Sequence, residues 1–265
     1  MTEPDEVDLD RPNAARVYDY YLGGSHNFAV DRQMGDEAIA MWPELPQIMQ
    51  ANRAFLRRAV HYCVEQGIRQ FLDLGSGIPT VGNVHEVAQL AAPGARVVYV
   101  DTDPVAVAYS KTLLTDNPDA DIVRADAREP DEVLASPEVS ALLDLDQPVA
   151  VMMVALLHFI GDESKPREVI ARYRDAVAPG SYLAISHATA EGRPDLAGDH
   201  ADLYQQRTTT PMTFRSRTEI GAFFDGFELV DPGLVFLPQW RPVSPAEVGD
   251  NPERLTALVG VGRRL

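Results

Sequence analysis

The middle of the chain alternates short β-rich runs with helical segments, and this order limits the fold more than any other feature of the sequence. From Ile68 onward, short apolar runs are separated by segments with helical periodicity. Such alternation is typical of βαβ units, in which crossover helices join parallel strands. The expected strands are 70–74, 96–101, 121–125, 148–155 and 181–186, and the expected helices between them are 81–91, 104–114 and 165–177.

The C-terminal part departs from this alternation. A polar stretch, 191–210, precedes a helical segment at 216–224 and two apolar runs at 227–236 and 255–262. Two closing strands joined by a proline-containing loop are typical of an antiparallel pair at a sheet edge. We therefore expect residues 68–265 to form one α/β unit: a Rossmann-like, seven-stranded, mostly parallel sheet with an antiparallel C-terminal hairpin and helices on both faces.

Helical character also precedes the first strand. Residues 14–22 follow Asn13, which is a suitable N-cap, and residues 46–66 end at Gly67. We expect residues 1–67 to form a helical extension in front of the sheet.

The composition excludes several classes of partner. The chain has 40 acidic and 23 basic residues and a formal net charge of −17, so it repels polyanions and gains little from counterion release. Its longest apolar stretch, 149–160, is shorter than the roughly 20 residues of a membrane-spanning helix. We expect a small-molecule substrate and neither a nucleic-acid nor a membrane partner, and the sequence leaves the oligomeric state open.

Cysteine and histidine usage indicates the compartment and the metal content. Cys63 is the only cysteine, so neither an intramolecular disulfide nor a cysteine-rich metal site can form. The acidic start lacks the charged-then-apolar order of a secretory signal. The histidines show no metal-ligand spacing. We expect a cytoplasmic protein without a bound metal.

A glycine-rich turn follows the first expected strand, in the run Asp73-Leu74-Gly75-Ser76-Gly77. Glycines at a strand-to-helix turn let a ligand approach the backbone. The dinucleotide fingerprint requires a third glycine or alanine where this chain has Thr80, directly after Pro79. The turn therefore argues against a nicotinamide cofactor, and an NAD-dependent oxidoreductase is a less favoured alternative.

Carboxylates follow the second and third expected strands. Asp101 ends the second strand, where an acid can accept hydrogen bonds from both ribose hydroxyls of an adenosine. Asp103, followed by Pro104, is better suited to cap the next helix. Asp126 follows the third strand and could receive an adenine amino group while Ala127 donates its backbone amide, although an acid at this place could equally cap a turn.

One histidine lies where the fourth expected strand ends. His158 could accept a proton from a substrate hydroxyl or amine, because the pKa of an imidazole lies near neutral pH. The alternative is that it packs at the sheet edge or hydrogen-bonds the backbone. His187, at the end of the next strand, has the same two interpretations with less support.

Together these residues resemble the class I S-adenosylmethionine-dependent methyltransferases, in which a strand ends in Asp-x-Gly-x-Gly and acids follow the next two strands. A closer resemblance covers nearly the whole chain. It rests on the N-terminal run 15–24 with Asn27-Phe28 and Asp31-Arg32, on the glycine turn through Thr80, on residues 99–104 and on residues 157–160. In these motifs the chain is similar to a bacterial S-adenosyl methyltransferase family long catalogued as a domain of unknown function.

The resemblance implies a methyltransferase fold with S-adenosyl-L-methionine as cofactor. It also implies that residues 1–67 form a lid in which Arg16, Tyr21, Gly23 and Asn27 contact the methionine end or line the substrate entrance, with packing and a simple helix end as the alternatives. The cofactor-binding residues expected from the turn, the acids and the resemblance are Asp73, Gly75, Ser76, Gly77, Pro79, Asp101, Thr102, Asp126, Ala127, Arg128, Ala155 and Leu156. His158 is the candidate catalytic base.

We expect methyl transfer to an unidentified O or N acceptor of low molecular mass. Because a sulfonium is already an activated leaving group, positioning and exclusion of water do most of the work. No Asn-Pro-Pro-Tyr or Asp-Pro-Pro-Tyr motif follows Ala155, which argues against methylation of nucleic-acid bases. The alternative is a regulatory or interaction protein that binds S-adenosylmethionine without turnover, since no base is assured.

Overall fold

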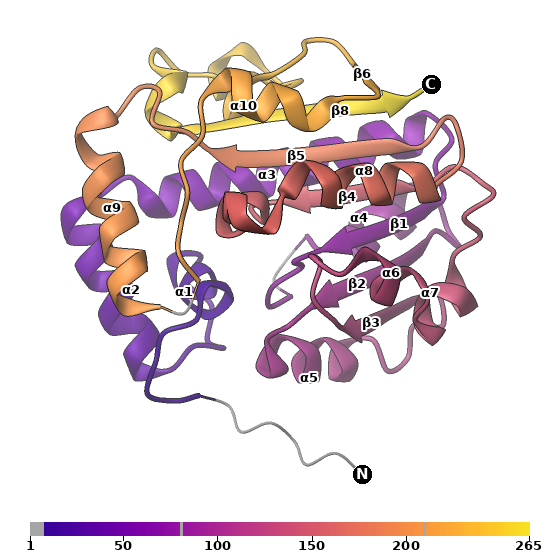
Figure 1. Cartoon of the computed structure of the whole chain (residues 1–265), viewed down its shortest axis with the longest axis horizontal. Helices are drawn as coiled ribbons and strands as arrows, with labels where there is room; N and C mark the ends of the chain where they lie inside the picture. The colour runs from indigo at the N-terminus through magenta and orange to yellow at the C-terminus, as the bar shows by residue number, and fades with distance from the viewer. Residues whose placement is uncertain (1–7, 80–81, 209) are drawn as a thin grey trace.

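The computed structural model describes residues 8–79, 82–208 and 210–265. Its centre is a sheet with the strand order β3-β2-β1-β4-β5-β8-β6, and the short β7 also pairs with β8 (Figure 1). The strands are β1 (Gln70–Leu74), β2 (Arg96–Asp101), β3 (Ala120–Arg124), β4 (Ala150–Val154), β5 (Tyr182–Ala188), β6 (Phe227–Leu229), β7 (Val235–Phe236) and β8 (Ala257–Arg264).

Strands β1 to β5 are parallel, and β8 runs antiparallel to both β5 and β6. This confirms the mostly parallel sheet with an antiparallel C-terminal hairpin. The sheet has eight strands rather than the expected seven, because the apolar run 227–236 forms β6 and β7 separately. Pro232 and Gly233 interrupt it, since proline offers no ladder donor and Gly233 has a φ of +85°.

The expected helices are present, and two unexpected long ones, α2 and α9, are added. Asn13 and Asp103 cap α1 and α5 as expected, since each side chain accepts two backbone N–H groups. The helices are α1 (Ala14–Tyr21), α2 (Ala29–Met41), α3 (Leu45–Glu65), α4 (Val84–Ala91), α5 (Pro104–Leu113), α6 (Pro130–Leu134), α7 (Pro137–Leu142), α8 (Pro166–Ala176), α9 (Pro194–Arg207) and α10 (Arg217–Gly221). Short 3₁₀ turns lie at Leu157–Phe159, Asp162–Ser164, Ala222–Phe224, Leu237–Gln239, Pro245–Glu247 and Pro252–Leu255.

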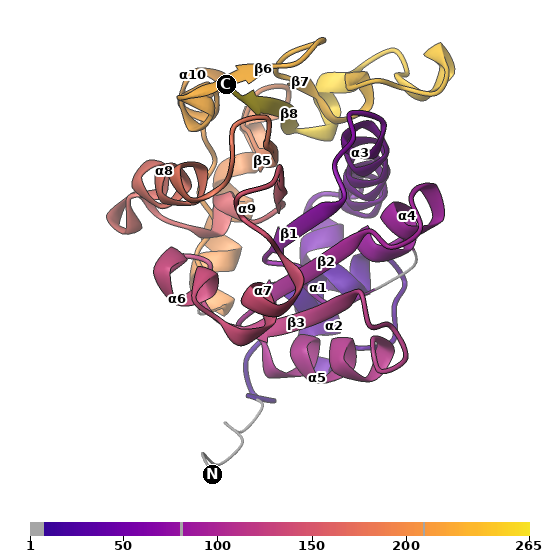
Figure 2. The same cartoon turned by 90° about the vertical axis from the view of Figure 1, so that its right-hand side faces the viewer.

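Helices lie on both faces of the sheet (Figure 2), and a buried apolar layer fills the space on each face. Side chains alternate along a strand, so Phe71 packs in the layer of α3 and α4, whereas Leu72 packs in the layer of α6 to α8. Helix α3 contributes Phe55 and Cys63 to the first layer, and burial raises the pKa of the Cys63 thiol to about 12. Residues before and after position 67 thus share one core, while the lid role of residues 1–67 stays a prediction.

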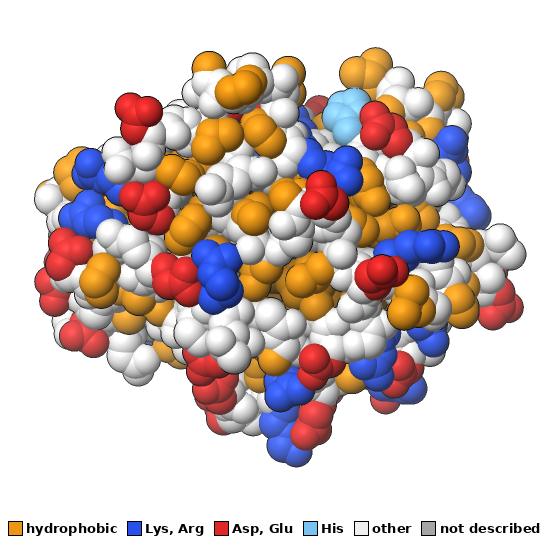
Figure 3. Space-filling model, turned by 90° about the horizontal axis from the view of Figure 1, so that it is seen from above, with side chains coloured by type: hydrophobic (Ala, Val, Ile, Leu, Met, Phe, Trp, Pro, Cys, Tyr) orange, Lys and Arg blue, Asp and Glu red, His pale blue; other side chains and the backbone are white. Residues whose placement is uncertain are grey.

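Helices α1, α2 and α9 lie beside the carboxyl ends of the parallel strands, at the left of Figure 1. Within the described ranges, no helix is long and apolar enough to cross a membrane, and no three His, Cys, Asp or Glu side chains gather as a metal site. Figure 3 shows basic side chains scattered among acidic and apolar ones on the face that it views, without a continuous basic stripe.

Candidate active site

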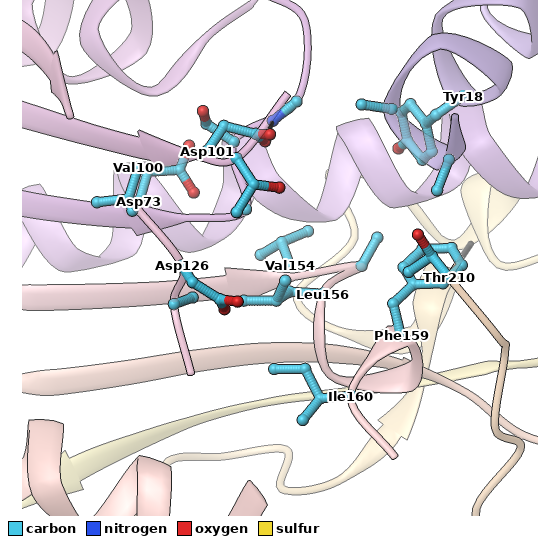
Figure 4. Close-up of a pocket in the computed structure, with 18 of the residues that line it drawn as sticks. Tyr18, Asp73, Val100, Asp101, Asp126, Val154, Leu156, Phe159, Ile160 and Thr210 are labelled. Atoms are coloured by element: carbon cyan, nitrogen blue, oxygen red, sulfur yellow. Dashed lines mark hydrogen bonds between the residues drawn. The ribbon is translucent and has the colours of Figure 1, made fainter. Parts of the chain in front are cut away.

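A cavity of about 420 Å³, here called the larger cavity, lies at the carboxyl ends of β1 to β4 and faces α1 and α3 (Figure 4). Such a crevice is the usual ligand site of an open α/β sheet. Except for Pro79, every strand-end residue predicted to bind the cofactor lines it. These lining residues are Asp73, Gly75, Ser76, Gly77, Asp101, Thr102, Asp126, Ala127, Arg128, Ala155 and Leu156. Thr80, which argued against a dinucleotide, lies outside the described residues.

The glycine turn after β1 presents backbone to the larger cavity. Gly75 and Gly77 have φ values of +67° and +65°, a region that favours glycine. A Cβ atom on Gly75 would lie 2.5 Å from Cδ1 of Leu156, so a larger residue would collide there. The Gly75 N–H donates to the Val100 carbonyl at 2.8 Å, which fixes the turn against β2.

Asp101 closes β2 and supports this turn directly. One carboxylate oxygen accepts a hydrogen bond from the Gly77 N–H at 2.7 Å, and the other accepts one from the Asp103 N–H at 2.9 Å. Burial raises the pKa of the Asp101 carboxyl, although both backbone donors oppose that rise. Each oxygen has a second lone pair, so Asp101 can still accept hydrogen bonds from two ligand hydroxyls.

One part of the larger cavity combines an ionisable acid with unused donors. Burial raises the pKa of Asp73 to about 7 against the opposing charge of Arg53, and the Asp101 charge adds to the rise. Arg53, from α3, donates to the Asn83 side chain at 3.1 Å, while its Nε is buried without a partner. The Ser76 hydroxyl is also buried and unpartnered. This set suits a ligand that carries both a carboxylate and an ammonium group.

The acid after β3 is paired within its own turn. Asp126 accepts the Arg128 guanidinium, with Nε at 2.9 Å and Nη2 at 2.5 Å from one oxygen. Burial alone would raise the pKa of Asp126, but the hydrogen bonds and charge of Arg128 outweigh it and lower that pKa. The neighbouring Ala127 carbonyl accepts the Tyr173 hydroxyl at 3.0 Å. A ligand amino group would therefore share Asp126 with Arg128.

The end of β4 is strained and tied to three other elements. Ala155 has a φ of +59°, an uncommon value for a residue with a side chain. Its N–H donates to the Ser186 hydroxyl at 2.8 Å, and that hydroxyl donates to Asn52 at 2.6 Å. The Asn52 amide then donates to the Tyr18 hydroxyl at 2.9 Å. Strain of this kind persists where surrounding contacts determine it, commonly at functional sites.

His158 does not line the larger cavity. It lines an adjoining cavity of about 60 Å³, here called the smaller cavity. Burial lowers the pKa of His158 well below its usual value, and neighbouring His187, the Arg215 charge and His200 lower it further. The imidazole is therefore neutral at neutral pH and able to accept a proton, and its Nδ1 is buried without a partner.

His187 is fully engaged in hydrogen bonds, which supports the backbone-bonding interpretation for this residue. Nη1 of Arg215 donates to its Nε2 at 2.9 Å, so Nδ1 carries the proton and donates to the Ala188 carbonyl at 2.7 Å. Burial lowers the pKa of His187 to about 4. Arg215 also donates to two carbonyls of the turn 157–160, at 2.9 and 2.8 Å, and thereby holds the turn that carries His158.

Arg16 lies outside the walls of both cavities, in a buried network of charges. Its Nε donates to Asp31 at 2.9 Å and its Nη1 donates to Asp103 at 3.2 Å. Nη2 binds backbone carbonyls at 3.1 and 2.8 Å. The guanidinium therefore joins α1 to α2 and to the loop after β2, instead of reaching toward a ligand.

The other three N-terminal candidates are also placed away from the larger cavity. Tyr21 lines the smaller cavity. Gly23, with a φ of +76°, follows the end of α1, and the Asn27 amide donates to Asp19 at 2.8 Å. Gly23 and Asn27 line neither cavity, so for them the geometry agrees with the helix-end and packing alternatives.

Helices α1 and α3 supply walls that the sequence interpretation did not include. Tyr18, Asn52 and Arg53 line the larger cavity. The available signal is the polar Asn52 in the buried stripe of α3, four residues after Ile48 and three before Phe55. A polar residue in an apolar stripe needs a buried partner, and Ser186 and Tyr18 provide it here.

A family model described as S-adenosyl methyltransferase matches residues 1–265. This chain belongs to that family. It is 40% identical to a DUF574 family protein from Streptomyces avermitilis MA-4680, with a TM-score of 0.94 over 98% of this chain and 100% of that one. It is 39% identical to a protein from Thermobifida fusca YX that is provisionally named a methyltransferase, with a TM-score of 0.92 over 100% of this chain and 99% of that one.

A more distant structure shows the fold alone. Human N-acetylserotonin methyltransferase, in complex with S-adenosylmethionine, is 15% identical, with a TM-score of 0.50 over 96% of this chain and 63% of that one. Among curated proteins, the comparison finds no match. The family and the fold confirm the resemblance seen in the sequence: the chain is a class I methyltransferase that uses S-adenosylmethionine.

Proposed function

We propose that this methyltransferase acts on a small-molecule oxygen or nitrogen acceptor, which binds in the smaller cavity with its reacting atom at the boundary with the larger one. The observation that carries the proposal is a common wall: Ala14, Tyr18, Asn52, Ala155 and Phe159 line both cavities. Adjoining sites with a common wall favour direct transfer between two bound small molecules. The net charge of −17 supports a small molecule over a nucleic acid.

The polar groups of the larger cavity fit S-adenosylmethionine. We assign Asp101 to the ribose hydroxyls, because it lines the larger cavity and each of its carboxylate oxygens accepts one backbone hydrogen bond, from Gly77 or from Asp103, and keeps a second lone pair. The unpartnered Arg53 Nε and Ser76 hydroxyl suit the methionine carboxylate, and the Asp73 carboxyl suits the ammonium group. Asp126, beside Arg128, is assigned to the adenine amino group.

When bound, S-adenosylmethionine supplies a methyl group attached to a sulfonium sulfur, and this sulfur is a leaving group that needs no general acid. The residues of the chain bind, orient and exclude water. His158 is assigned as the group that holds the proton released by the acceptor. Its depressed pKa keeps the imidazole available in the neutral form but makes it a weak base, so it suits an acceptor that loses its proton late in the transfer.

Two variants test these assignments separately. Asp101→Ala should weaken S-adenosylmethionine binding by at least about 100-fold, because two hydrogen bonds to a charged group contribute about 1.5–3 kcal/mol each. His158→Ala should leave that affinity unchanged and lower methyl transfer. His61→Ala, which removes an exposed imidazole of α3, is the matched control for the second variant.

Binding is measured by titration calorimetry. Transfer is measured as the incorporation of labelled methyl groups from S-adenosylmethionine into the components of a fractionated cell extract. Unchanged affinity in Asp101→Ala would remove the ribose assignment. Full transfer in His158→Ala would return His158 to a packing role. Tight cofactor binding without transfer to any fraction would contradict the proposed reaction.

A further inference from the structure

The smaller cavity is enclosed by segments that are far apart in the sequence. Its walls include Trp42 at the end of α2, His200 and Tyr204 of α9, and Met212 and Phe214 before α10. Because the two cavities share lining residues, a molecule held there lies next to the larger cavity. The chemistry of this wall therefore restricts what can receive the methyl group.

No ionised side chain is available to a ligand in this wall. Among the residues that the structure describes, no Asp, Glu, Lys or Arg lines the smaller cavity. Aromatic rings dominate instead: the ring centroid of His200 lies 5.5 Å from that of Trp42, 5.1 Å from that of Tyr204 and 6.4 Å from that of Phe214. Burying an unpaired charge among such groups costs far more than burying a neutral ring. The wall therefore selects an uncharged occupant.

The three imidazoles of the wall do not change this conclusion. His187 is held neutral by its two hydrogen bonds, and burial lowers the pKa of His200 to about 4. The pKa of His158 is also lowered by burial and by the neighbouring His187, Arg215 and His200. At neutral pH the smaller cavity thus carries no positive charge that could hold a carboxylate or a phosphate.

Three ring nitrogens in this wall lack a hydrogen-bond partner within the described part of the protein. Trp42 Nε1, His158 Nδ1 and His200 Nδ1 are all buried without a hydrogen bond. Unsatisfied buried groups are uncommon and destabilising, and a ligand can satisfy them. We propose that the methyl acceptor is an uncharged molecule with a single aromatic ring that carries a hydroxyl or a nitrogen. This inference rests on the proposed function and specifies its acceptor.

The volume sets an upper limit on the size of the acceptor. About 60 Å³ is well below the roughly 150 Å³ of an engineered cavity that holds benzene, so a fused ring system is excluded and a single ring must extend across the common wall toward the larger cavity. The acceptor oxygen or nitrogen forms a bond to the methyl carbon while the carbon–sulfur bond breaks and its electron pair passes to sulfur. The products are the methylated acceptor and neutral S-adenosylhomocysteine, and the proton released by the acceptor passes to His158 and then to solvent.

The first experiment compares three probes on the wild-type protein saturated with S-adenosylhomocysteine. Phenol is the uncharged ring, benzoate the anionic one and benzylammonium the cationic one. Titration calorimetry at neutral pH should show phenol binding at least tenfold more tightly than either ion. Binding of benzoate or benzylammonium as tight as that of phenol would overturn the proposal, and so would an absence of phenol binding.

The second experiment uses a matched pair of tryptophan variants. Trp42 and Trp240 are both fully buried, and both have an unpartnered Nε1, but Trp240 lines neither cavity. Trp42→Phe should weaken phenol binding by about 3- to 10-fold, the range for one neutral hydrogen bond. Trp240→Phe should change it by less than about twofold. Equal effects of the two substitutions would contradict a role for Trp42 in binding the acceptor.

Failure of this inference and failure of the proposed function are distinguishable. If wild-type protein binds S-adenosylmethionine and methylates a component of an extract but does not bind phenol, only the acceptor class is wrong. If it binds S-adenosylmethionine and transfers no methyl group at all, the proposed function is wrong. The probe comparison uses the wild type alone, so it holds even if Trp42→Phe does not fold.

Discussion

The buried carboxyl of Asp73 provides the sharpest test of the electrostatics of the larger cavity. Burial raises its pKa to about 7 from an ordinary value of 3.8. Between these two values the folded protein holds a proton that the unfolded chain releases. The stability associated with that proton is fully present below about pH 4 and is lost as the pH rises through about 7.

The expected magnitude follows from the shift. About 3 pKa units at 1.36 kcal/mol each correspond to about 4 kcal/mol. Asp73→Asn keeps the shape of the side chain and removes its ionisation. The free energy of unfolding of the wild type should therefore fall relative to that of the variant, by up to about 4 kcal/mol, between pH 4 and pH 8.

Asp126 provides a control of opposite sign. Arg128 outweighs the effect of burial and lowers the pKa of Asp126, so the ionised carboxylate stabilises the folded state. That stabilisation is present above the ordinary pKa and is lost as the pH falls through the lowered one. Asp126→Asn should thus be less stable than the wild type at neutral pH, and the difference should disappear in acid.

Urea unfolding of the ligand-free proteins, followed by circular dichroism from pH 4 to pH 8, measures both effects. S-Adenosylmethionine should also stabilise the wild type more at pH 8 than at pH 5.5, because an ammonium partner favours the ionised form of Asp73. Parallel pH curves for the wild type and Asp73→Asn would refute the reasoning, since they would show that this carboxyl does not titrate between its unfolded and folded pKa values.

Three further substitutions test the local geometry. Gly75→Ala should lower stability by about 1–3 kcal/mol and weaken cofactor binding in calorimetry, because its Cβ meets Leu156. Ala155→Gly should change the free energy of unfolding by less than about 0.5 kcal/mol, since relief of left-handed strain offsets the added chain flexibility. Arg215→Lys should lower kcat without changing cofactor affinity. A single ammonium group cannot replace the contacts that the guanidinium makes with the turn 157–160 and with His187. A kcat equal to that of the wild type would contradict this.

The sheet could be predicted from the sequence because its strands are buried on both faces. The expected strands 70–74 and 96–101 coincide with β1 and β2, since continuous apolar runs bounded by turns identify buried parallel strands. Helix α9 could not be predicted in the same way. Only four of its residues are buried, namely Ala197, His200, Leu203 and Tyr204, and its other side chains are mostly polar, so the segment resembled a polar connection.

The strand-end residues of the site could also be predicted, whereas for the N-terminal motif the sequence left a ligand-contacting and a packing interpretation open. Turn chemistry and strand order bring Gly75 and Asp101 together in any sheet of this kind. Arg16 and Asn27, in contrast, bind Asp31, Asp103 and Asp19. A polar motif needs hydrogen-bonding partners whether it meets a ligand or another segment, and only the tertiary structure distinguishes these two cases.

The buried charges around Arg16 bear on whether α1 can open as a hinged lid. The guanidinium and the Asp103 carboxylate are each 3% exposed, and the Asp103 N–H donates to Asp101 in the wall of the larger cavity. Removing one partner of a buried pair leaves an uncompensated charge and costs about 3–5 kcal/mol. Opening α1 as a hinged flap would break this pair. We therefore expect α1 to remain a fixed wall of the site, whose contacts with Asp103 also support the loop after β2.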